Sequence, residues 1–288
     1  MSISGVIVAY QTNVTRLDAI LRVLASQCSV VLADNSEDPG CSAAIRRCVE
    51  HHGGVYIAMG GNRGIGVAQN AAIAAAWVRG AASVLLLDDD SIPAPDLVAV
   101  LTSCRSPIAG ERAVFCASAA DAAGKDISNV RHRGVALTRC REMMSSGSLI
   151  HRDVFEAVGP FDAKLFVDGV DFDWGWRAQE QGVKIYIARD ACIVHRLGEG
   201  KIGGLRVPSS IRHYYQFRNI LHLMARRHTP WRWRIAQALK LPTKLVLISL
   251  LMPNRTQRIR YALAGVRDAI QGRSGKYAEP SITDARPA

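Results

Sequence analysis

Short apolar runs rich in β-branched residues alternate with longer amphipathic segments through roughly the first 110 residues. The apolar runs predict strands at 5–10, 29–34, 55–60 and 83–88, and the amphipathic segments predict helices at 15–26, 41–52 and 66–80. Asn13 or Thr15 is placed to cap the first of these helices. Strands that alternate with helices in this order indicate an α/β fold with a doubly wound, mostly parallel sheet.

Polar or glycine residues follow three of these strands. Asp34 ends the second strand, the segment 60–66 follows the third, and Asp88–Asp90 follow the fourth. Ligands of doubly wound sheets bind at the carboxyl ends of the strands. We therefore expect the three groups to lie along one edge of the sheet and to form the site.

The pattern is less regular between residues 111 and 200. It predicts strands at AVFCASA, GVALTR, VKIYIA (183–188) and CIVHRLG (192–198), and helices at 152–159 and 170–182. Gly182 is well placed to end the second of these helices in the left-handed conformation.

The charge is distributed unevenly. The chain of 288 residues has a formal net charge of +11, and residues 201–288 contain 17 Lys and Arg but only 3 Asp and Glu. A basic segment of this kind predicts an anionic partner, which is a membrane lipid, a nucleic acid or a phosphorylated substrate. The apolar stretch 245–253 is much shorter than the ~20 residues of a spanning helix. Basic amphipathic helices with Trp at their boundary favour a membrane surface.

The cysteines and the N-terminus indicate the compartment. Seven cysteines include no CxxC pair, which suits reduced thiols in the cytosol better than a disulfide framework. The segment GVIVAY follows almost directly after Met1, without the basic region of a signal peptide. We expect a cytosolic protein.

The run LLLDDDS (85–91) has two interpretations. An acidic turn that caps the following helix would need only one carboxylate. A D-x-D pair at a strand end places two carboxylates on one side, where they can bind Mg²⁺ or Mn²⁺. The residue types fit a hard cation.

Three further features also have a structural and a functional interpretation. GNRGIGVAQNAAI (61–73) is either a turn before a helix or a loop that approaches a nucleotide. In FVDGVDFDWGWR (166–177), Asp173 can pair with Arg177 and Asp171 can cap the helix, or one carboxylate can act as a general base. His195 is either structural or a metal ligand.

Taken together, the motifs resemble glycosyltransferase family 2, inverting enzymes of the GT-A fold that use nucleotide-sugars. The resemblance covers about residues 4–222 and is closest to bacterial rhamnosyltransferases of O-antigen and other cell-surface polysaccharides. It rests on motifs in the family's order: VIVAYQTN, VVLADNS, GNRGIGVAQNAAI, LLLDDDS, SSGSLIHRDVFEAVGPFDAKLFVDGVDFDWGWRAQEQG, IVHRLG and HYYQFRN. The usual form of this motif in the subfamily is D-Q-D, and here Asp89 stands in place of the Gln. The pair expected to matter for metal binding is therefore Asp88 and Asp90. Val170-Asp171 replaces the family's common E-D, as in the rhamnosyl branch.

The resemblance implies a role for each site residue. Asp171 is the general base. Asp90 and His195 hold the divalent cation, Mg²⁺ or Mn²⁺, on the donor's diphosphate. The remaining acceptor-side or supporting residues are Asp168, Asp173, Trp174 and Arg177. The donor-binding residues are Ala9, Tyr10, Asp34, Asn62, Gly64, Gly66, Asp88 and Asp89, with Asp34 on the pyrimidine and Asp88 on the ribose.

The resemblance also predicts the reaction and its partners. We expect transfer of L-rhamnose from dTDP-L-rhamnose to a lipid-linked saccharide, with a galactofuranosyl or other hexosyl donor as the alternative. The glycosyltransferase domain is expected over 1–222. Residues 223–288 are expected to form a basic helical region on the anionic inner face of the plasma membrane. The resemblance leaves open whether the protein forms a homo-oligomer. A nucleic-acid-binding protein would leave the D-x-D, Asp171 and His195 unexplained, and RHTPWRWR matches no nucleic-acid motif.

Overall fold

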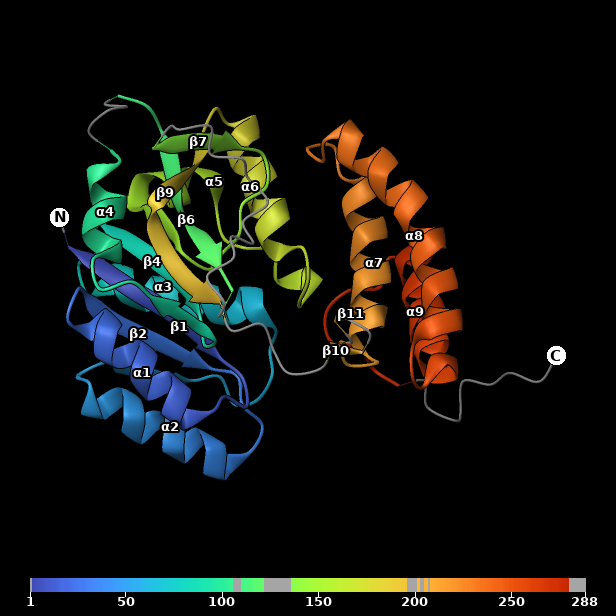
Figure 1. Cartoon of the computed structure of the whole chain (residues 1–288), viewed down its shortest axis with the longest axis horizontal. Coiled ribbons are helices and arrows are strands. Elements are labelled where there is room, and N and C mark those ends of the chain that lie inside the picture. Colours follow the sequence, from blue (N-terminus) through green and yellow to red (C-terminus); the bar gives the residue numbers. More distant parts are fainter. Residues whose placement is uncertain are drawn as a thin grey trace. The chain divides into compact units, whose positions relative to one another are not determined.

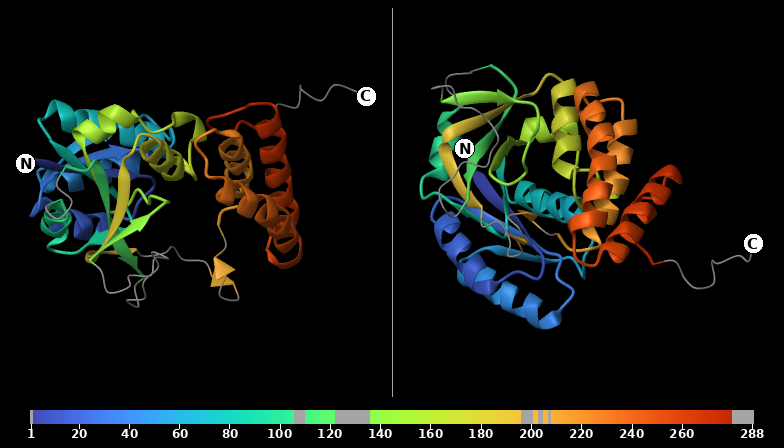
Figure 2. Two further views of the ribbon diagram at one scale, coloured as in Figure 1. Left: turned by 90° about the horizontal axis from the view of Figure 1, so that it is seen from above. Right: turned by 45° about the vertical axis from the view of Figure 1, so that its right-hand side comes forward.

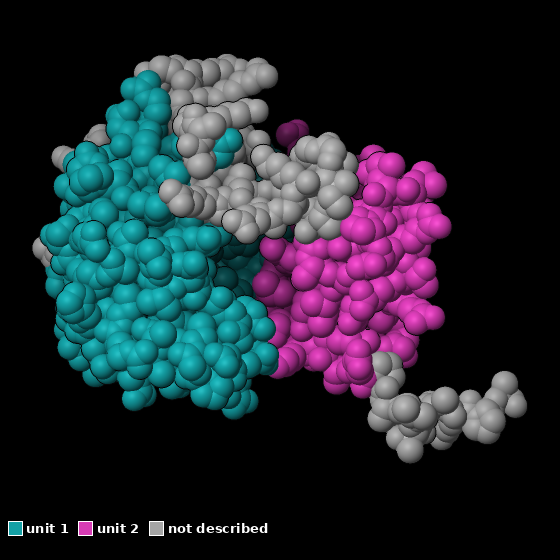
Figure 3. Space-filling model, turned by 60° about the horizontal axis from the view of Figure 1, so that its bottom comes forward, with its two compact units in different colours: residues 1–163, 169–199 teal, residues 164–168, 200–288 magenta. Residues whose placement is uncertain are grey.

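The structure is a computed structural model that describes residues 2–105, 110–121, 136–195, 201–202, 205–206 and 208–279. The chain forms two compact units (Figure 3). Unit 1 comprises residues 1–163 and 169–199, and unit 2 comprises residues 164–168 and 200–288. The domain boundary after residue 222 stays a prediction from the sequence.

The first half of unit 1 is the parallel α/β arrangement that the sequence predicts (Figure 1). Its strands are β1 (Ile3–Ala9), β2 (Ser29–Asp34), β3 (Val55–Ala58) and β4 (Ser83–Asp88). They pair in parallel in the order β3-β2-β1-β4. Strands β2 and β4 are almost continuously apolar because both faces of this sheet are covered by helices.

Three helices connect these strands: α1 (Val14–Ala25), α2 (Pro39–His51) and α3 (Ile65–Val78). The strand order moves outward from β1 to β3 and then returns to β4. Right-handed crossovers therefore place α1 and α2 on one face of the sheet and α3 on the other, as Figure 2 shows. Leu17, Leu21 and Leu24 of α1 are fully buried in the core of the first face.

The second half of unit 1 extends the sheet beyond β4. Its elements are β5 (Ser91–Pro93), α4 (Leu97–Ser103), β6 (Ala113–Ala120), β7 (Leu137–Cys140), β8 (Ser148–His151), α5 (Arg152–Val158), α6 (Val170–Glu180) and β9 (Lys184–His195). β8 pairs antiparallel with β4 and β6, β9 pairs parallel with β6, and β9 pairs antiparallel with β5 and β7. Part of the strand predicted at GVALTR and the end of the one predicted at CIVHRLG lie outside the described residues.

The residues predicted to cap the start of α1 and to follow the end of α6 do so in the structure. The side chain of Asn13 accepts a hydrogen bond from the backbone N–H of Arg16 at 3.0 Å and caps α1. Gly182 follows α6 with a φ of +80°, which an L side chain rarely adopts.

Unit 2 contains α7 (Arg212–Ala225), α8 (Trp231–Leu251), α9 (Arg255–Ile270) and the short strands β10 (Lys201–Ile202) and β11 (Leu205–Arg206). Its described residues include two small apolar clusters, one formed by Phe217, Leu241, Ile248 and Ala262 and the other by Phe166, Tyr214 and Tyr215. Gly265 lets α9 approach α7 closely, since a Cβ there would lie 2.4 Å from the carbonyl oxygen of Tyr214. Within the described part of the chain, no helix combines the length and the apolar character that crossing a membrane requires.

Candidate functional site

The carboxyl ends of the parallel strands bring the predicted groups to one edge of the sheet. Ala9 at the end of β1 is the register partner of Asp34 at the end of β2. On the other side of β1, Val8 is the partner of Asp88. Asp34 is also the partner of Ala58, the last residue of β3, which precedes the glycine segment. The sequence prediction that these groups share one edge is confirmed at the level of the backbone.

Asp34 is held in place by hydrogen bonds within the protein. Its side chain is buried, and its two oxygens accept hydrogen bonds from the backbone N–H of Ser36 at 2.9 Å and from the hydroxyl of Tyr56 at 2.8 Å. Arg46 lies over the Tyr56 ring, with its guanidinium carbon 4.9 Å from the ring centroid. Each carboxylate oxygen has two lone pairs, so these two bonds leave acceptor capacity.

The glycine segment is fixed by Asn35, the residue after Asp34. The Asn35 amide donates to the carbonyl oxygen of Gly64 at 3.1 Å and accepts from the backbone N–H of Arg63 at 3.3 Å. Asn62 accepts from the N–H of Gly64 at 3.1 Å, which closes a local Asx turn. Gly64 has a φ of +90°, so a side chain at this position would strain the turn before α3.

Gly66 is required for a different reason. Its backbone is close to the segment before α6, because a Cβ at Gly66 would lie 3.2 Å from the carbonyl oxygen of Asp162 and 3.4 Å from Val170. The first turn of α3 therefore packs directly against the start of α6, the helix that carries Asp171.

The three aspartates at the end of β4, Asp88 to Asp90, have different environments. The backbone N–H of Asp88 donates to the Ser146 hydroxyl at 3.1 Å, and that hydroxyl donates to Ser91 at 2.9 Å. Asp89 accepts a hydrogen bond from the backbone N–H of Tyr10 at 3.1 Å. Burial raises the pKa of the Asp89 carboxyl above its ordinary value, while the Tyr10 N–H lowers it. Asp89 therefore binds the loop after β1.

His195 belongs to the same region through the backbone. It is the last residue of β9 and the antiparallel register partner of Ser91, the residue directly after Asp90. The sheet thus brings the end of β9 beside the D-x-D segment, although 104 positions of sequence separate the two partners.

Asp171 and Asp173, in the first turn of α6, have different hydrogen-bond partners. Asp173 is only 1% exposed and accepts from the Arg177 guanidinium at 3.0 Å. Arg177 also donates to the carbonyl oxygens of Val158 and Pro160 at 2.9 and 2.8 Å. The fully buried Trp174 donates from its indole nitrogen to the carbonyl oxygen of Gly159 at 2.8 Å. This network fixes α6 to the end of α5 and confirms the predicted pair of Asp173 with Arg177. The prediction that Asp171 caps the helix is wrong, because the cap position is Gly169 and no side chain caps this end of α6.

Asp171 lies one residue into α6 and is half-buried. One of its carboxylate oxygens accepts a hydrogen bond from the N–H of Phe172 at 2.9 Å. Burial raises the pKa of the Cys116 thiol to about 11, and the negative charge of Asp171 also raises it. Asp171 is thus close to β6, and Cys116 of that strand contacts Ser148 of β8 at 3.1 Å.

Asp168 belongs to unit 2 and is paired. Its carboxylate receives hydrogen bonds from the Arg212 guanidinium, at 2.7 Å from Nη2 and 3.1 Å from Nε. The Asn219 amide donates to the carbonyl oxygens of Leu165 and Asp168 at 2.8 and 2.9 Å. The fully buried Arg218 donates to the carbonyl oxygen of Leu165 at 3.0 Å. Helix α7 therefore fixes the segment 164–168, which directly precedes the start of α6.

Sequence reasoning missed several of these residues. Asn35 and Ser36 follow Asp34 within the quoted motif VVLADNS, and Arg218 and Asn219 end the motif HYYQFRN. Their position inside motifs was a usable signal. Ser146 also lies inside a quoted motif, SSGSLIHRDVFEAVG, but its partners could not be predicted from the sequence, because they depend on the pairing of β4 with β8.

A mostly parallel α/β sheet with a carboxylate-rich edge, extended by antiparallel strands, is the fold of the GT-A class. Residues 3–232 match the family model described as glycosyltransferase-like family 2, so the chain belongs to this family. It is a nucleotide-sugar-dependent glycosyltransferase. The fold class and family expected from the sequence are confirmed.

The relatives agree with this assignment. The chain is 29% identical over 294 aligned residues to the dTDP-rhamnosyl transferase RfbF of Shigella flexneri, covering 95% of this chain and 97% of that protein. Residues 1–349 of S. aureus TarS, solved with UDP-GlcNAc, superpose with a TM-score of 0.58 at 12% identity, over 94% of this chain and 82% of that one. The mannosyltransferase PcManGT from Pyrobaculum calidifontis, solved with GDP-Man and Mn²⁺, superposes with a TM-score of 0.54 at 15% identity. The superposition covers 93% of this chain and 73% of that one. The chain spans 55% of a longer TarS chain.

Proposed function

We propose that this glycosyltransferase transfers L-rhamnose from dTDP-L-rhamnose to a lipid-linked saccharide during synthesis of a cell-surface polysaccharide. The observation that carries the proposal is the similarity to a dTDP-rhamnosyl transferase along nearly the whole length of both chains. The carboxylate edge of the sheet supports it, since this edge offers hydrogen-bond acceptors for a nucleotide and oxygen ligands for a cation.

The donor binds along the carboxyl ends of β1 to β4. Asp34 accepts a hydrogen bond from the pyrimidine with its remaining lone pairs, and Ala9 and Tyr10 form the floor beside it. The turn that Asn35 holds forms one wall of the nucleotide-sugar site, with Asn62, Gly64 and Gly66. Asp88 binds the ribose, and Asp89 positions the loop at Tyr10.

The residues at the end of β4 fit a divalent cation. Asp88 ends β4 and Asp90 lies two residues further along the chain, and the register pairing of Ser91 with His195 brings the backbone of β9 beside them. Carboxylate oxygens with one imidazole suit Mn²⁺ or Mg²⁺. Asp90 and His195 would hold the ion, which would neutralise charge on the departing nucleoside diphosphate.

Asp171 is the general base. The hydrogen bond from Phe172 orients its carboxylate, and the Asp173–Arg177 pair fixes the helix that presents it. Asp171 takes the proton of the acceptor hydroxyl while that oxygen attacks the anomeric carbon. The nucleoside diphosphate departs from the opposite face, so the configuration inverts in a single displacement.

Unit 2 provides the contact with the membrane that contains the lipid-linked acceptor. Helix α8 carries an apolar stripe, defined here as Trp231, Ile235, Leu239, Val246 and Leu250, and each of these side chains is more than half exposed. At about 100° per residue, the five positions fall within roughly 100° of the helix circumference. An exposed apolar face this long favours insertion into a lipid interface.

The charge of this region selects an anionic membrane. Residues 201–288 contain 17 basic and 3 acidic residues, and Arg232 and Lys240 are exposed on α8 beside the stripe. Each basic residue near an anionic surface is worth ~1 kcal/mol. We therefore place the protein at the inner face of the plasma membrane, held by electrostatic attraction and by the apolar stripe.

A donor panel tests the proposed substrate. The full chain is incubated with Mn²⁺, a membrane extract that contains lipid-linked saccharides, and dTDP-L-rhamnose, UDP-galactofuranose, UDP-glucose or GDP-mannose, and nucleoside diphosphate release is measured. We expect turnover of dTDP-L-rhamnose well above the others. Preferred turnover of UDP-galactofuranose would assign a different sugar to the same fold, and the rhamnosyl proposal would then be wrong.

A further inference from the structure

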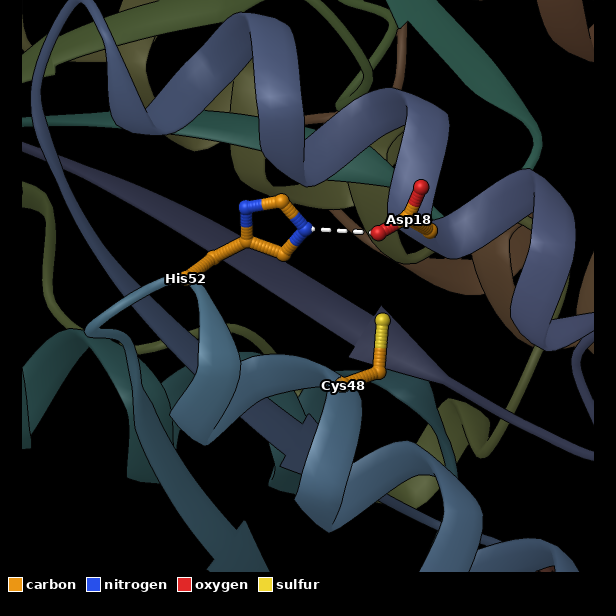
Figure 4. A group of neighbouring side chains, drawn as sticks. All are labelled: Asp18, Cys48 and His52. Carbon is orange, nitrogen blue, oxygen red and sulfur yellow. Dashed lines mark hydrogen bonds and ion pairs between the residues drawn. The ribbon is translucent and has the colours of Figure 1, made fainter.

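Three side chains from two helices form a cluster that the sugar-transfer site does not use. They are Asp18 of α1, Cys48 of α2 and His52, the residue that follows the last turn of α2. Figure 4 shows all three side chains converging on the space between the two helices. None of them belongs to a strand end or to the glycine segment.

The geometry of the cluster matches a set of metal ligands. One ligand atom from each residue, the Cys48 sulfur, a His52 ring nitrogen and an Asp18 carboxylate oxygen, lies within 4.8 Å of the other two. Around a tetrahedral Zn²⁺, with bonds of about 2.0–2.3 Å, such atoms lie roughly 3.3–3.8 Å apart. Small side-chain rotations therefore close the cluster around an ion.

The backbone already places the ligands correctly. Cys48 lies in the last turn of α2, and His52, four residues later, is the residue directly after the helix, so both side chains can face the same side. The Nε2 atom of His52 is 2.8 Å from Oδ1 of Asp18, so the contact between the helices exists without the metal. The Arg22 guanidinium binds the other Asp18 oxygen at 2.5 Å and orients the carboxylate.

The burial of the cluster also suits a metal site. Cys48 packs against the apolar core of unit 1, and the His52 side chain is only 13% exposed, whereas that of Asp18 is 34% exposed. The cluster is therefore open to solvent on the Asp18 side, where an ion can enter and a water can complete the coordination.

We propose that Asp18, Cys48 and His52 bind a zinc ion that links α1 to the C-terminal turn of α2. Thiolate and imidazole ligands select Zn²⁺ over the hard cations Mg²⁺ and Mn²⁺. On binding, Cys48 releases its thiol proton to solvent, and His52 carries its ring proton on Nδ1 so that Nε2 faces the ion. Water occupies the fourth position, and the ion stabilises unit 1.

Zinc binding to the full-length protein tests this proposal. The protein is freed of metal with a chelator and held in excess Mg²⁺, which saturates sites made of carboxylates. It is then titrated with Zn²⁺ by calorimetry and, separately, with Co²⁺, whose thiolate complexes absorb in the near ultraviolet. The variants are Cys48→Ser and His52→Gln. The matched controls are Cys41→Ser on the same helix and His51→Gln at the adjacent position.

We expect one equivalent of Zn²⁺ and a thiolate–cobalt band in the unsubstituted protein and in both controls. Cys48→Ser and His52→Gln should lose both signals while keeping their helix content by circular dichroism. Zinc should raise the melting temperature of the unsubstituted protein but not of these two variants. A folded, unsubstituted protein without the cobalt band would overturn the proposal, and so would full zinc binding by Cys48→Ser.

Discussion

Ser91 and His195 are backbone partners in the antiparallel pair of β5 and β9. This pairing brings the backbone of residue 195 beside the D-x-D segment, and the proposed cation site rests on it. We expect Asp90→Asn and His195→Ala to raise the Mn²⁺ concentration needed for half-maximal activity, because each removes one ligand. Asp96→Asn, an exposed carboxylate nearby, should leave that concentration unchanged. Full turnover by metal-freed protein in excess EDTA would exclude the ion from the reaction.

Asn35 should control the shape of the donor-binding turn. Asn35→Ala leaves the buried carbonyl oxygen of Gly64 and the N–H of Arg63 without their partner, which costs about 1–3 kcal/mol of unfolding free energy. The KM for the donor should also rise, because the turn at Gly64 loses its anchor. Asn13→Ala is the control: it removes a helix cap and costs about 1 kcal/mol, but should leave the KM for the donor unchanged. Equal KM values in both variants would contradict this role.

The pairings across the sheet explain how far the sequence could predict this site. Local signals identified the strand ends, the Asn13 cap and the left-handed Gly182, since each depends on a few neighbouring residues. The pairing of β5 with β9 was not predictable in this way, because it depends on the register of residues about a hundred positions apart.

The aspartates show the same limit. Spacing on a helix was enough to predict the pair of Asp173 with Arg177. It could not show that Arg212 binds Asp168, or that Asn219 holds the carbonyl oxygen of Asp168, since both depend on the fold of unit 2. Nor could it show that Asp89 binds the N–H of Tyr10.

His213 should make the stability of unit 2 depend on pH. It is fully buried, and its Nε2 lies 3.0 Å from the Arg258 guanidinium; arginine has only donors, so the imidazole accepts and is neutral. Burial, with the positive charges of Lys244 and Arg258, lowers the pKa of His213 from 6.5 to about 4. Between these values the unfolded chain binds more protons than the folded one. The contribution of the neutral His213 to the free energy of unfolding is therefore fully present above pH 6.5. It falls by up to ~3 kcal/mol as the pH drops to 4.

Urea unfolding between pH 8 and pH 4 measures this effect in the unsubstituted protein and in His213→Gln. Glutamine can accept the Arg258 hydrogen bond but does not titrate, so its curve should be flatter over this window. His222→Gln replaces a partly exposed histidine of the same helix and should keep the original slope. The same slope in His213→Gln and the unsubstituted protein would show that other groups cause the pH dependence.

The apolar stripe on α8 should be required for membrane binding. Burying a leucine side chain is worth about 1.5–3 kcal/mol, so each of Leu239→Ser and Leu250→Ser should weaken vesicle binding roughly tenfold or more. Sedimentation with vesicles of phosphatidylglycerol and phosphatidylcholine measures this binding. Leu263→Ser, an exposed leucine on α9, is the matched control. High salt should also release the protein, because the attraction to the lipid headgroups is screened. A loss as large in Leu263→Ser as in the stripe variants would mean that the stripe is not the docking surface.

The identity of the catalytic base is the central claim, and one comparison tests it most directly. The kcat for nucleoside diphosphate release from the preferred donor is measured for Asp171→Asn and Asp173→Asn, with donor affinity determined by calorimetry. Asp171→Asn keeps the shape of the side chain but cannot take the acceptor's proton, so kcat should fall about 10²–10⁴-fold while donor affinity is retained. Asp173→Asn weakens the buried bond to Arg177 and should lower the unfolding free energy by about 1.5–3 kcal/mol, with kcat of the folded protein close to normal. A near-normal kcat for Asp171→Asn would contradict the account and move the base to another carboxylate.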